Sequence, residues 1–340
     1  HPILHTRTNQ IFELFFEKEH PLESRTIASY KTPSGQRVEI TRQSFPSVRK
    51  RPTKRVAFVS GLHGNELEGI YLCHLLIRHL KNLQQTQPEA FQGEIHIYPA
   101  VNPQAVAVGS RLSPFFSLDI NRQFGGNDAR SLPAQSASEL FDDLKSSADI
   151  VVDFHASNLH LQEAPQIRII DGLHKKLIPL AVQCNVDLIW VHPAAPMFES
   201  TLGYNLNRAK INTLVIEAGI SLRLNKKFAD QLFRGMLNLL HHTGVLTSTG
   251  STFKIDPPVI AHPSEVALLQ SEYAGVFVGH CDLKTNIAKG EMIGEVVSVT
   301  DGEILQEVTA PKSGLLFTLR EHPLVYPGAP LARIALKEMS

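Results

Sequence analysis

Residues 56–66 read VAFVSGLHGNE, a short apolar run that leads into a polar loop. Such a continuous apolar run is typical of a strand that is buried on both faces of a parallel sheet. Residues 67–83 then carry apolar side chains at helical spacing, which predicts a helix directly after the loop. We therefore predict a strand, a loop that contains His63 and Glu66, and a helix, in that order.

Strands and helices continue to alternate up to about residue 243. Further strands are predicted at residues 94–100, 149–155, 188–192 and 212–218, and further helices at residues 136–147 and 225–243. This alternation indicates an α/β domain with a mostly parallel or mixed sheet flanked by helices.

The composition changes after about residue 250, where helical periodicity stops and Gly and Pro separate short apolar runs. Residues 274–296 and 313–334 form a weak internal repeat, which suggests two similar halves of a small β-barrel or β-sandwich. We predict two domains, an α/β domain at residues 1–250 and a smaller all-β domain at residues 251–340.

The bulk composition excludes several classes of function. Lys+Arg and Asp+Glu both number 33, so the formal net charge is zero and no long-range field attracts nucleic acid. No window of about 18 apolar residues is present, so we expect no membrane span. Residues 1–19 show no apolar core of a signal peptide. The three widely spaced cysteines favour a reducing compartment. We therefore expect a cytoplasmic protein; the sequence leaves its oligomeric state open, a homo-oligomer included.

Polar residues occur at the carboxyl ends of four predicted strands, where sites form in α/β sheets. They are His63, Asn102, His155 and Glu217. His63 and Glu66 can reach one cation, and His155 is the natural third ligand, which leaves a position open for water as catalytic zinc requires. The H-x-x-E pair alone also fits ordinary polar residues at a helix start. Its placement and His155 favour the metal site, although other divalent ions can occupy such a set.

Two carboxylates near this set have two interpretations each. Asp153 lies on the same strand face as His155, so it either orients a ligand histidine or is a buried Asp satisfied by backbone donors. Glu217 is costly to bury without a role. It either serves as general base and then proton donor beside an activated water, or it belongs to a structural salt bridge.

Arginine and amide side chains provide candidate substrate contacts. Arg111, Asn121 and Arg122 fit carboxylate recognition and oxyanion stabilisation, because Arg binds carboxylates bidentately and keeps its charge. Each Arg taken alone also fits a surface residue. Arg168 alternates with apolar residues and points either to the site or to solvent.

The ordered set of motifs resembles the succinylglutamate desuccinylase/aspartoacylase family of zinc carboxypeptidase-like hydrolases. The resemblance runs from about residue 55 to the end of the chain and rests on GLHGNELEG (61–69), NP (102–103), Arg111, DINR (119–122), DFH (153–155) and EAG (217–219). It implies one Zn²⁺ per chain on His63, Glu66 and His155, and a zinc-carboxypeptidase-like fold.

The resemblance also implies roles for the polar residues, with Glu217 as general base and Arg111, Asn121 and Arg122 as substrate contacts. The metal and a nearby Arg would hold the developing oxyanion. The implied activity is a zinc-dependent amidohydrolase that cleaves the amide bond of an N-acyl amino acid or a related small carboxylate-bearing amide. The bulky apolar loop at residues 113–117 leaves the identity of the acyl group open. The sequence does not specify the amine partner either. A zinc carboxypeptidase on short peptides and a non-catalytic binding protein remain as alternatives.

Overall fold

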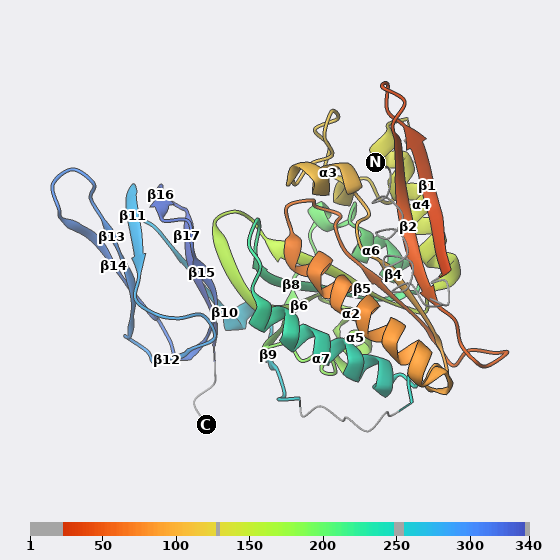
Figure 1. The fold of residues 1–340 in the computed structure, drawn as a ribbon. Helices are drawn as coiled ribbons and strands as arrows, with labels where there is room; N and C mark the ends of the chain where they lie inside the picture. The colour runs from red at the N-terminus through yellow and green to blue at the C-terminus, as the bar shows by residue number, and fades with distance from the viewer. Residues whose placement is uncertain (1–22, 127–129, 248–254, 337–340) are drawn as a thin grey trace, which may run out of the picture.

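A mixed β-sheet forms the centre of the computed structural model, which describes residues 23–126, 130–247 and 255–336 (Figure 1). Its first strands run in the spatial order β1-β2-β4-β3-β5-β8-β6, and β7 pairs with β6. Their bounds are β1 Glu23–Lys31, β2 Arg37–Phe45, β3 Arg55–Val59, β4 Glu94–Tyr98, β5 Ile150–Ser157, β6 Leu161–Ile170, β7 Leu188–His192 and β8 Asn212–Ile220. Strands β4, β3, β5 and β8 are parallel, whereas β6 is antiparallel to β8. The predicted mixed α/β fold is confirmed.

Helices cover both faces of this sheet. Helices α2 (Leu67–Thr86), α5 (His174–Ala181) and α7 (Lys226–His242) pack on the face that carries Phe58 and Val152. Helices α4 (Leu132–Ser147) and α6 (Leu202–Arg208) pack on the opposite face, against Ala57 and Val151. Successive residues of β3 and β5 thus enter different cores, and this explains why both strands read as continuous apolar runs.

The C-terminal residues form an all-β unit of two sheets, as predicted. One sheet contains β10 (Val266–Gln270), β15 (Gly314–Arg320) and β17 (Pro330–Leu336), and the other has β11 (Gly275–Gly279), β13 (Met292–Val297), β14 (Ile304–Thr309) and β16 (Leu324–Val325). Phe277, Ile293, Leu316 and Ile334 lie in the core between the sheets, which makes the unit a sandwich. Strand β15 also pairs with β6, so the first sheet continues the central one.

The internal repeat of the sequence appears as a reciprocal pairing pattern. Strand β11 pairs with β13, and β15 pairs with β17. The short β12 (Asn286–Ile287) pairs with β15, and β16 in turn pairs with β11. Gly290 and Gly328 occupy corresponding turns with φ of 81° and 82°, a conformation that favours glycine. Each half therefore lends a short strand to the other.

The element bounds follow the predictions closely, and local chemistry explains one difference. Helix α4 begins at Leu132 rather than at residue 136, because the Ser131 side chain accepts the N–H of Ala134 and caps the helix. The hairpin of β1 and β2 was not predicted.

Two predictions concern segments outside the described residues. The boundary at residues 250/251 lies within 248–254, and the absence of a signal peptide concerns residues 1–19. Just after the predicted boundary, strand β9 (Val259–Ala261) still pairs with β7 of the central sheet and not with any described strand of the sandwich.

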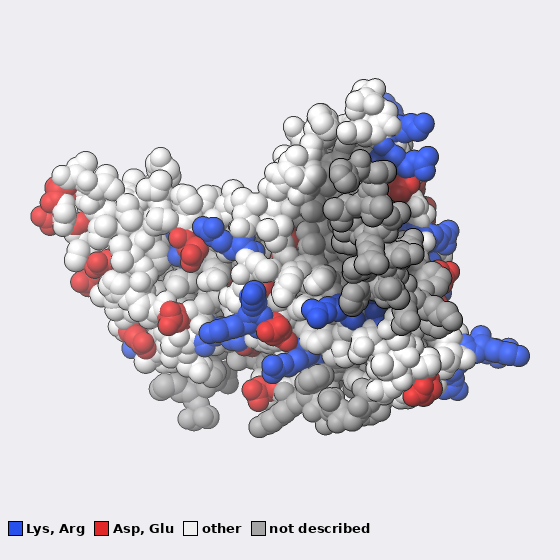
Figure 2. All heavy atoms as spheres, viewed as in Figure 1, with Lys and Arg blue, Asp and Glu red and all other residues white. Residues whose placement is uncertain are grey.

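The surface and the cysteines agree with the composition. Positive and negative side chains are interspersed over the face shown in Figure 2. Cys73, Cys184 and Cys281 are all free, as expected. Among the described helices, none is long and apolar enough to cross a bilayer. The cytoplasmic location stays a prediction.

Candidate metal centre and active site

The loop between β3 and α2 brings His63 and Glu66 to the carboxyl edge of the sheet. Gly64 permits this path, because a Cβ at this position would lie 1.9 Å from the carbonyl carbon of Ala105 in α3 (Pro103–Val108). Glu66 directly precedes α2, and His155 lies in the neighbouring strand β5. The structure therefore places these three residues together, as their strand-end positions predicted.

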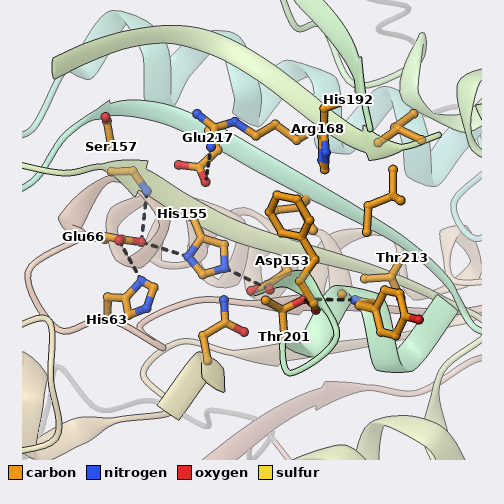
Figure 3. Close-up of a pocket in the computed structure, with 18 of the residues that line it drawn as sticks. His63, Glu66, Asp153, His155, Ser157, Arg168, His192, Thr201, Thr213 and Glu217 are labelled. Carbon is orange, nitrogen blue, oxygen red and sulfur yellow. Dashed lines mark hydrogen bonds and ion pairs between the residues drawn. The ribbon is translucent and has the colours of Figure 1, made fainter. Parts of the chain in front are cut away.

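The donor atoms of His63, Glu66 and His155 converge. Nδ1 of His63 lies 2.7 Å from Oε1 of Glu66, and Nδ1 of His155 lies 2.9 Å from Oε2 of Glu66. One ligand atom from each residue lies within 4.8 Å of the others, and all three side chains are buried. Figure 3 shows Glu66 between the two imidazoles.

The outer nitrogen of each histidine meets a second carboxylate. Nε2 of His63 lies 3.0 Å from Oδ1 of Asp119, and Nε2 of His155 lies 3.0 Å from Oδ2 of Asp153. Metal-binding histidines characteristically carry such a carboxylate on the nitrogen opposite the ion. Of the two interpretations of Asp153, the geometry supports the one in which Asp153 orients His155. Asp119 was quoted as part of a motif, but its contact with His63 was missed.

The electrostatics of this cluster favour a bound cation. Burial alone would raise the pKa of Glu66, but His63 and His155 lower it to about 2. Burial would lower the pKa of His155, but Asp153 and Glu66 raise it well above its ordinary value. The carboxylates thus hold positive charge on the imidazoles, and a metal ion replaces such protons when it binds. Two imidazoles and a carboxylate, each imidazole backed by another carboxylate, fit zinc.

Arg111 contacts the cluster directly. Its Nη1 donates to Oε1 of Glu66 at 3.2 Å and its Nη2 to Oδ2 of Asp119 at 3.0 Å. With both imidazoles neutral, the three carboxylates Glu66, Asp119 and Asp153 leave an excess of negative charge that Arg111 only partly offsets. A divalent cation would neutralise the remainder.

Asn121 and Arg122 belong to the 3₁₀ turn Ile120–Arg122 and line the cavity that His63, Glu66 and His155 also line. Oδ1 of Asn121 accepts the N–H of Leu202 at 2.9 Å, which ties this turn to the start of α6. Nη1 of Arg122 donates to the main-chain oxygen of Asn121 at 2.9 Å.

Glu217 and Arg168 form the other side of the site. Glu217 lies in register with His155 on the adjacent strand, and Nη1 of Arg168 lies 3.5 Å from its Oε1. Burial raises the pKa of Glu217 to about 7, although Arg168 acts to lower it. Of the two orientations left open for Arg168, the structure shows the one toward the site, as Figure 3 illustrates.

A cavity of about 410 Å³ connects these groups. Its lining combines polar side chains, which include His63, Glu66 and His155, with the apolar side chains of Ile170, Leu173, Phe198 and Val215. The apolar loop at residues 113–117 does not line it, and Phe115 is 88% exposed. Asn102 lies outside the cavity, where its Nδ2 donates to Leu62 and Ser113.

Other cavity residues were missed by sequence reasoning, and among them are Glu163, His192 and Arg333. His192 ends a predicted strand, so its position carried a signal that could have been used. Arg333 belongs to the C-terminal sandwich, and no motif or spacing connects it to His63, Glu66 and His155.

Comparisons with known proteins identify the family of this chain. Residues 52–243 match the family described as succinylglutamate desuccinylase/aspartoacylase catalytic domain. An N-alpha-acetyl-L-2,4-diaminobutyric acid deacetylase from Halomonas elongata is 26% identical over 290 residues, which cover 81% of this chain and 80% of the relative. The fold is shared with a product-bound ectoine utilization protein from Ruegeria pomeroyi (TM-score 0.75, 21% identity, 93% and 97% of the two chains covered). It is also shared with a succinylglutamate desuccinylase/aspartoacylase from Rhodobacter sphaeroides (TM-score 0.74, 23% identity, 94% and 98% covered). The chain belongs to the succinylglutamate desuccinylase/aspartoacylase family.

Proposed function

We propose that this protein is a zinc-dependent amidohydrolase that removes the acyl group from an N-acyl amino acid. The observation that carries the proposal is the convergence of His63, Glu66 and His155, each histidine backed by a carboxylate, beside the buried Glu217. The deacetylase relative from Halomonas elongata supports the same reaction class.

His63, Glu66 and His155 would hold the zinc ion. When bound there, zinc polarises the amide carbonyl and makes a water molecule acidic enough to attack it at neutral pH. The protein residues then have to move one proton and to stabilise negative charge.

Glu217 is suited to the proton transfer. A general base works best when its pKa lies near the operating pH, and burial raises the pKa of Glu217 to about 7. Its carboxylate accepts a proton from the attacking water and passes it to the nitrogen of the leaving amine. That transfer breaks the amide and yields a carboxylate and a free amine.

Arg111 is suited to stabilise the negative charge on the former carbonyl oxygen, because its guanidinium contacts Glu66 and its side chain, which is 40% exposed, lines the cavity. A fixed donor at such a position is a common source of rate enhancement. Asn121, Arg122 and Arg168 line the same cavity and are proposed to bind polar groups of the substrate.

The test begins with metal content per chain, measured by elemental analysis of protein purified without chelator. We expect about one zinc per chain in the wild type and its loss in His63→Ala. The matched control is His74→Ala, which changes an exposed histidine of α2 outside the cavity and should leave the zinc in place.

Turnover is then measured with N-acetyl and N-succinyl amino acids, N-acetyl-L-2,4-diaminobutyrate included, and with dipeptides. Faster hydrolysis of the N-acyl amino acids supports the proposal. A preference for dipeptides would make the protein a carboxypeptidase. Zinc binding without turnover of any of these compounds would favour a binding protein.

A further inference from the structure

We propose that Arg333, from the C-terminal β-sandwich, is a specificity-determining residue that binds the carboxylate of the amino-acid half of the substrate together with Arg168. The inference rests on the proposed amidohydrolase function and gives the β-sandwich a part in the catalytic cavity. Arg333 lines that cavity although it lies on β17.

The continuous sheet positions Arg333. In the register, Arg333 of β17 lies opposite Thr318 of β15, and Thr318 lies opposite Glu163 of β6. The three residues therefore form one row across the junction between the sandwich and the central sheet. Nη1 of Arg333 reaches along this row to Oε1 of Glu163 at 3.2 Å.

Glu163 holds two guanidinium groups at once. Its carboxylate is almost fully buried, at 1% exposed, and it accepts Nη2 of Arg168 at 2.8 and 2.7 Å as well as Nη1 of Arg333. Both arginines keep their charge at physiological pH. Arg168 has a second carboxylate, Glu217, at 3.5 Å, whereas Arg333 has only its share of Glu163 among the described residues. Arg333 is therefore the guanidinium whose charge an anionic group of a substrate would complete.

Trp190 fixes the orientation of the two arginines. The guanidinium carbons of Arg168 and Arg333 lie 5.6 and 5.7 Å from the centre of its ring, within the range of a cation–π contact. Phe317 packs edge-on against the ring at 5.7 Å. Held in this way, the guanidinium groups lose little freedom when they bind a ligand.

Both arginines have donors to spare. Nε of Arg168 is buried and has no partner among the described residues. Arg333 makes a single hydrogen bond within the described part of the chain, from Nη1, so its Nε and Nη2 remain for a ligand. A planar carboxylate matches such donors in geometry and charge.

The position of the two arginines relative to Glu217 indicates which half of the substrate carries the carboxylate that they bind. Arg168 is 3.5 Å from Glu217, the residue proposed to protonate the leaving amine, whereas Arg111 contacts Glu66 and Asp119. The amino-acid half leaves on the side of Glu217, so its carboxylate reaches Arg168 and Arg333.

The experiment compares kcat/KM for N-acetyl-L-2,4-diaminobutyrate and for its α-carboxamide in four proteins: wild type, Arg333→Gln, Arg333→Lys and Arg320→Gln. Arg320 is the matched control, because it is an arginine of the same sandwich whose hydrogen bonds within the described ranges go to carbonyl oxygens of its own unit, and it does not line the cavity. We expect the wild type to prefer the carboxylate, and Arg333→Gln to reduce this preference about 10- to 100-fold, mainly through KM. Arg333→Lys should keep part of the preference, and Arg320→Gln should keep all of it.

A purely structural role for Arg333 gives a different result, since loss of an anchor would lower turnover of both compounds equally. An equal loss, an unchanged preference in Arg333→Gln, or no preference in the wild type would each overturn the inference. If the wild type hydrolysed neither compound, the proposed reaction would fail for this probe. The same comparison is then made by calorimetric titration of both compounds, with the same criteria applied to their dissociation constants.

Discussion

Glu68, two residues after Glu66, allows a quantitative test of how burial raises the pKa of a carboxyl group in this protein. Its side chain is 2% exposed at the start of α2. Oε2 accepts the N–H of Asn225, the capping residue of α7, at 2.9 Å, and Oε1 has no partner in the described part of the chain. Burial raises the pKa of Glu68 from 4.5 to about 7, although main-chain donors of Asn225 and Ala229 act to lower it. The folded protein therefore favours the protonated acid.

The sign of the pH dependence follows from this shift. In the unfolded chain the carboxyl ionises near 4.5, whereas in the folded chain it resists ionisation up to about 7. The stability due to the protonated acid is complete below pH 4.5 and is lost as the pH rises through 7. A shift from 4.5 to about 7 corresponds to a loss of about 3 kcal/mol at high pH.

Glu68→Gln removes this loss, because the amide has the shape of the protonated acid and still accepts the N–H of Asn225. We expect the variant to gain about 2 kcal/mol more over wild type at about pH 8.5 than at about pH 5.5. The free energy of unfolding is measured by urea denaturation at both pH values, with chelator present so that metal binding does not contribute. An equal difference at the two pH values, or a variant less stable than wild type at the higher pH, would refute the reasoning.

Three other substitutions test the site and its loop. Glu217→Gln should lower kcat about 10²- to 10⁴-fold with zinc content unchanged, and near-normal rates in the variant would show that Glu217 is not the base. In the wild type, kcat/KM should fall as the pH drops below about 7, where Glu217 takes up a proton. Asp153→Asn should weaken zinc binding about 10- to 100-fold in competition with a chelator, because His155 loses its carboxylate partner; unchanged affinity would contradict that role. Gly64→Ala should lower the free energy of unfolding by about 1–3 kcal/mol in urea, since its Cβ would meet the main chain of Ala105 at 1.9 Å; wild-type stability would show that the loop can shift.

The strands that follow a single pattern were predictable from the sequence. Strand β5 is buried at every residue, so its apolar run directly indicates a strand that is covered on both faces. The β1–β2 hairpin was missed because β1 (ESRTIASYK) is largely exposed and mostly polar. Strand β6 contains Glu163 and Pro165 among its apolar residues. The buried Glu163 is tolerated because two arginines and Gln166 donate hydrogen bonds to it.

The same distinction applies to the site. His63 and Glu66 share one loop, and His155 ends a recognisable strand, so the metal candidates could be proposed from position alone. The contact of His63 with Asp119 spans 56 residues, and that of Glu163 with Arg333 spans 170. Such contacts depend on which strands become neighbours, and strand order is a property of the whole fold rather than of any local pattern.

The pairing of β6 limits how this chain can be divided. One edge of β6 binds β8, and the other is shared, with Leu161 to Glu163 pairing with β15 and Gln166 to Ile170 pairing with β7. Removal of the sandwich would leave the main-chain groups of the first segment open to solvent, as a template for the strand of another molecule. A shortened protein would thus lose Arg333, one of the two arginine partners of Glu163, and gain a tendency to aggregate at the same place. The residues of the central sheet and of the sandwich that meet at this junction can therefore be changed, or exchanged with those of another protein, only together.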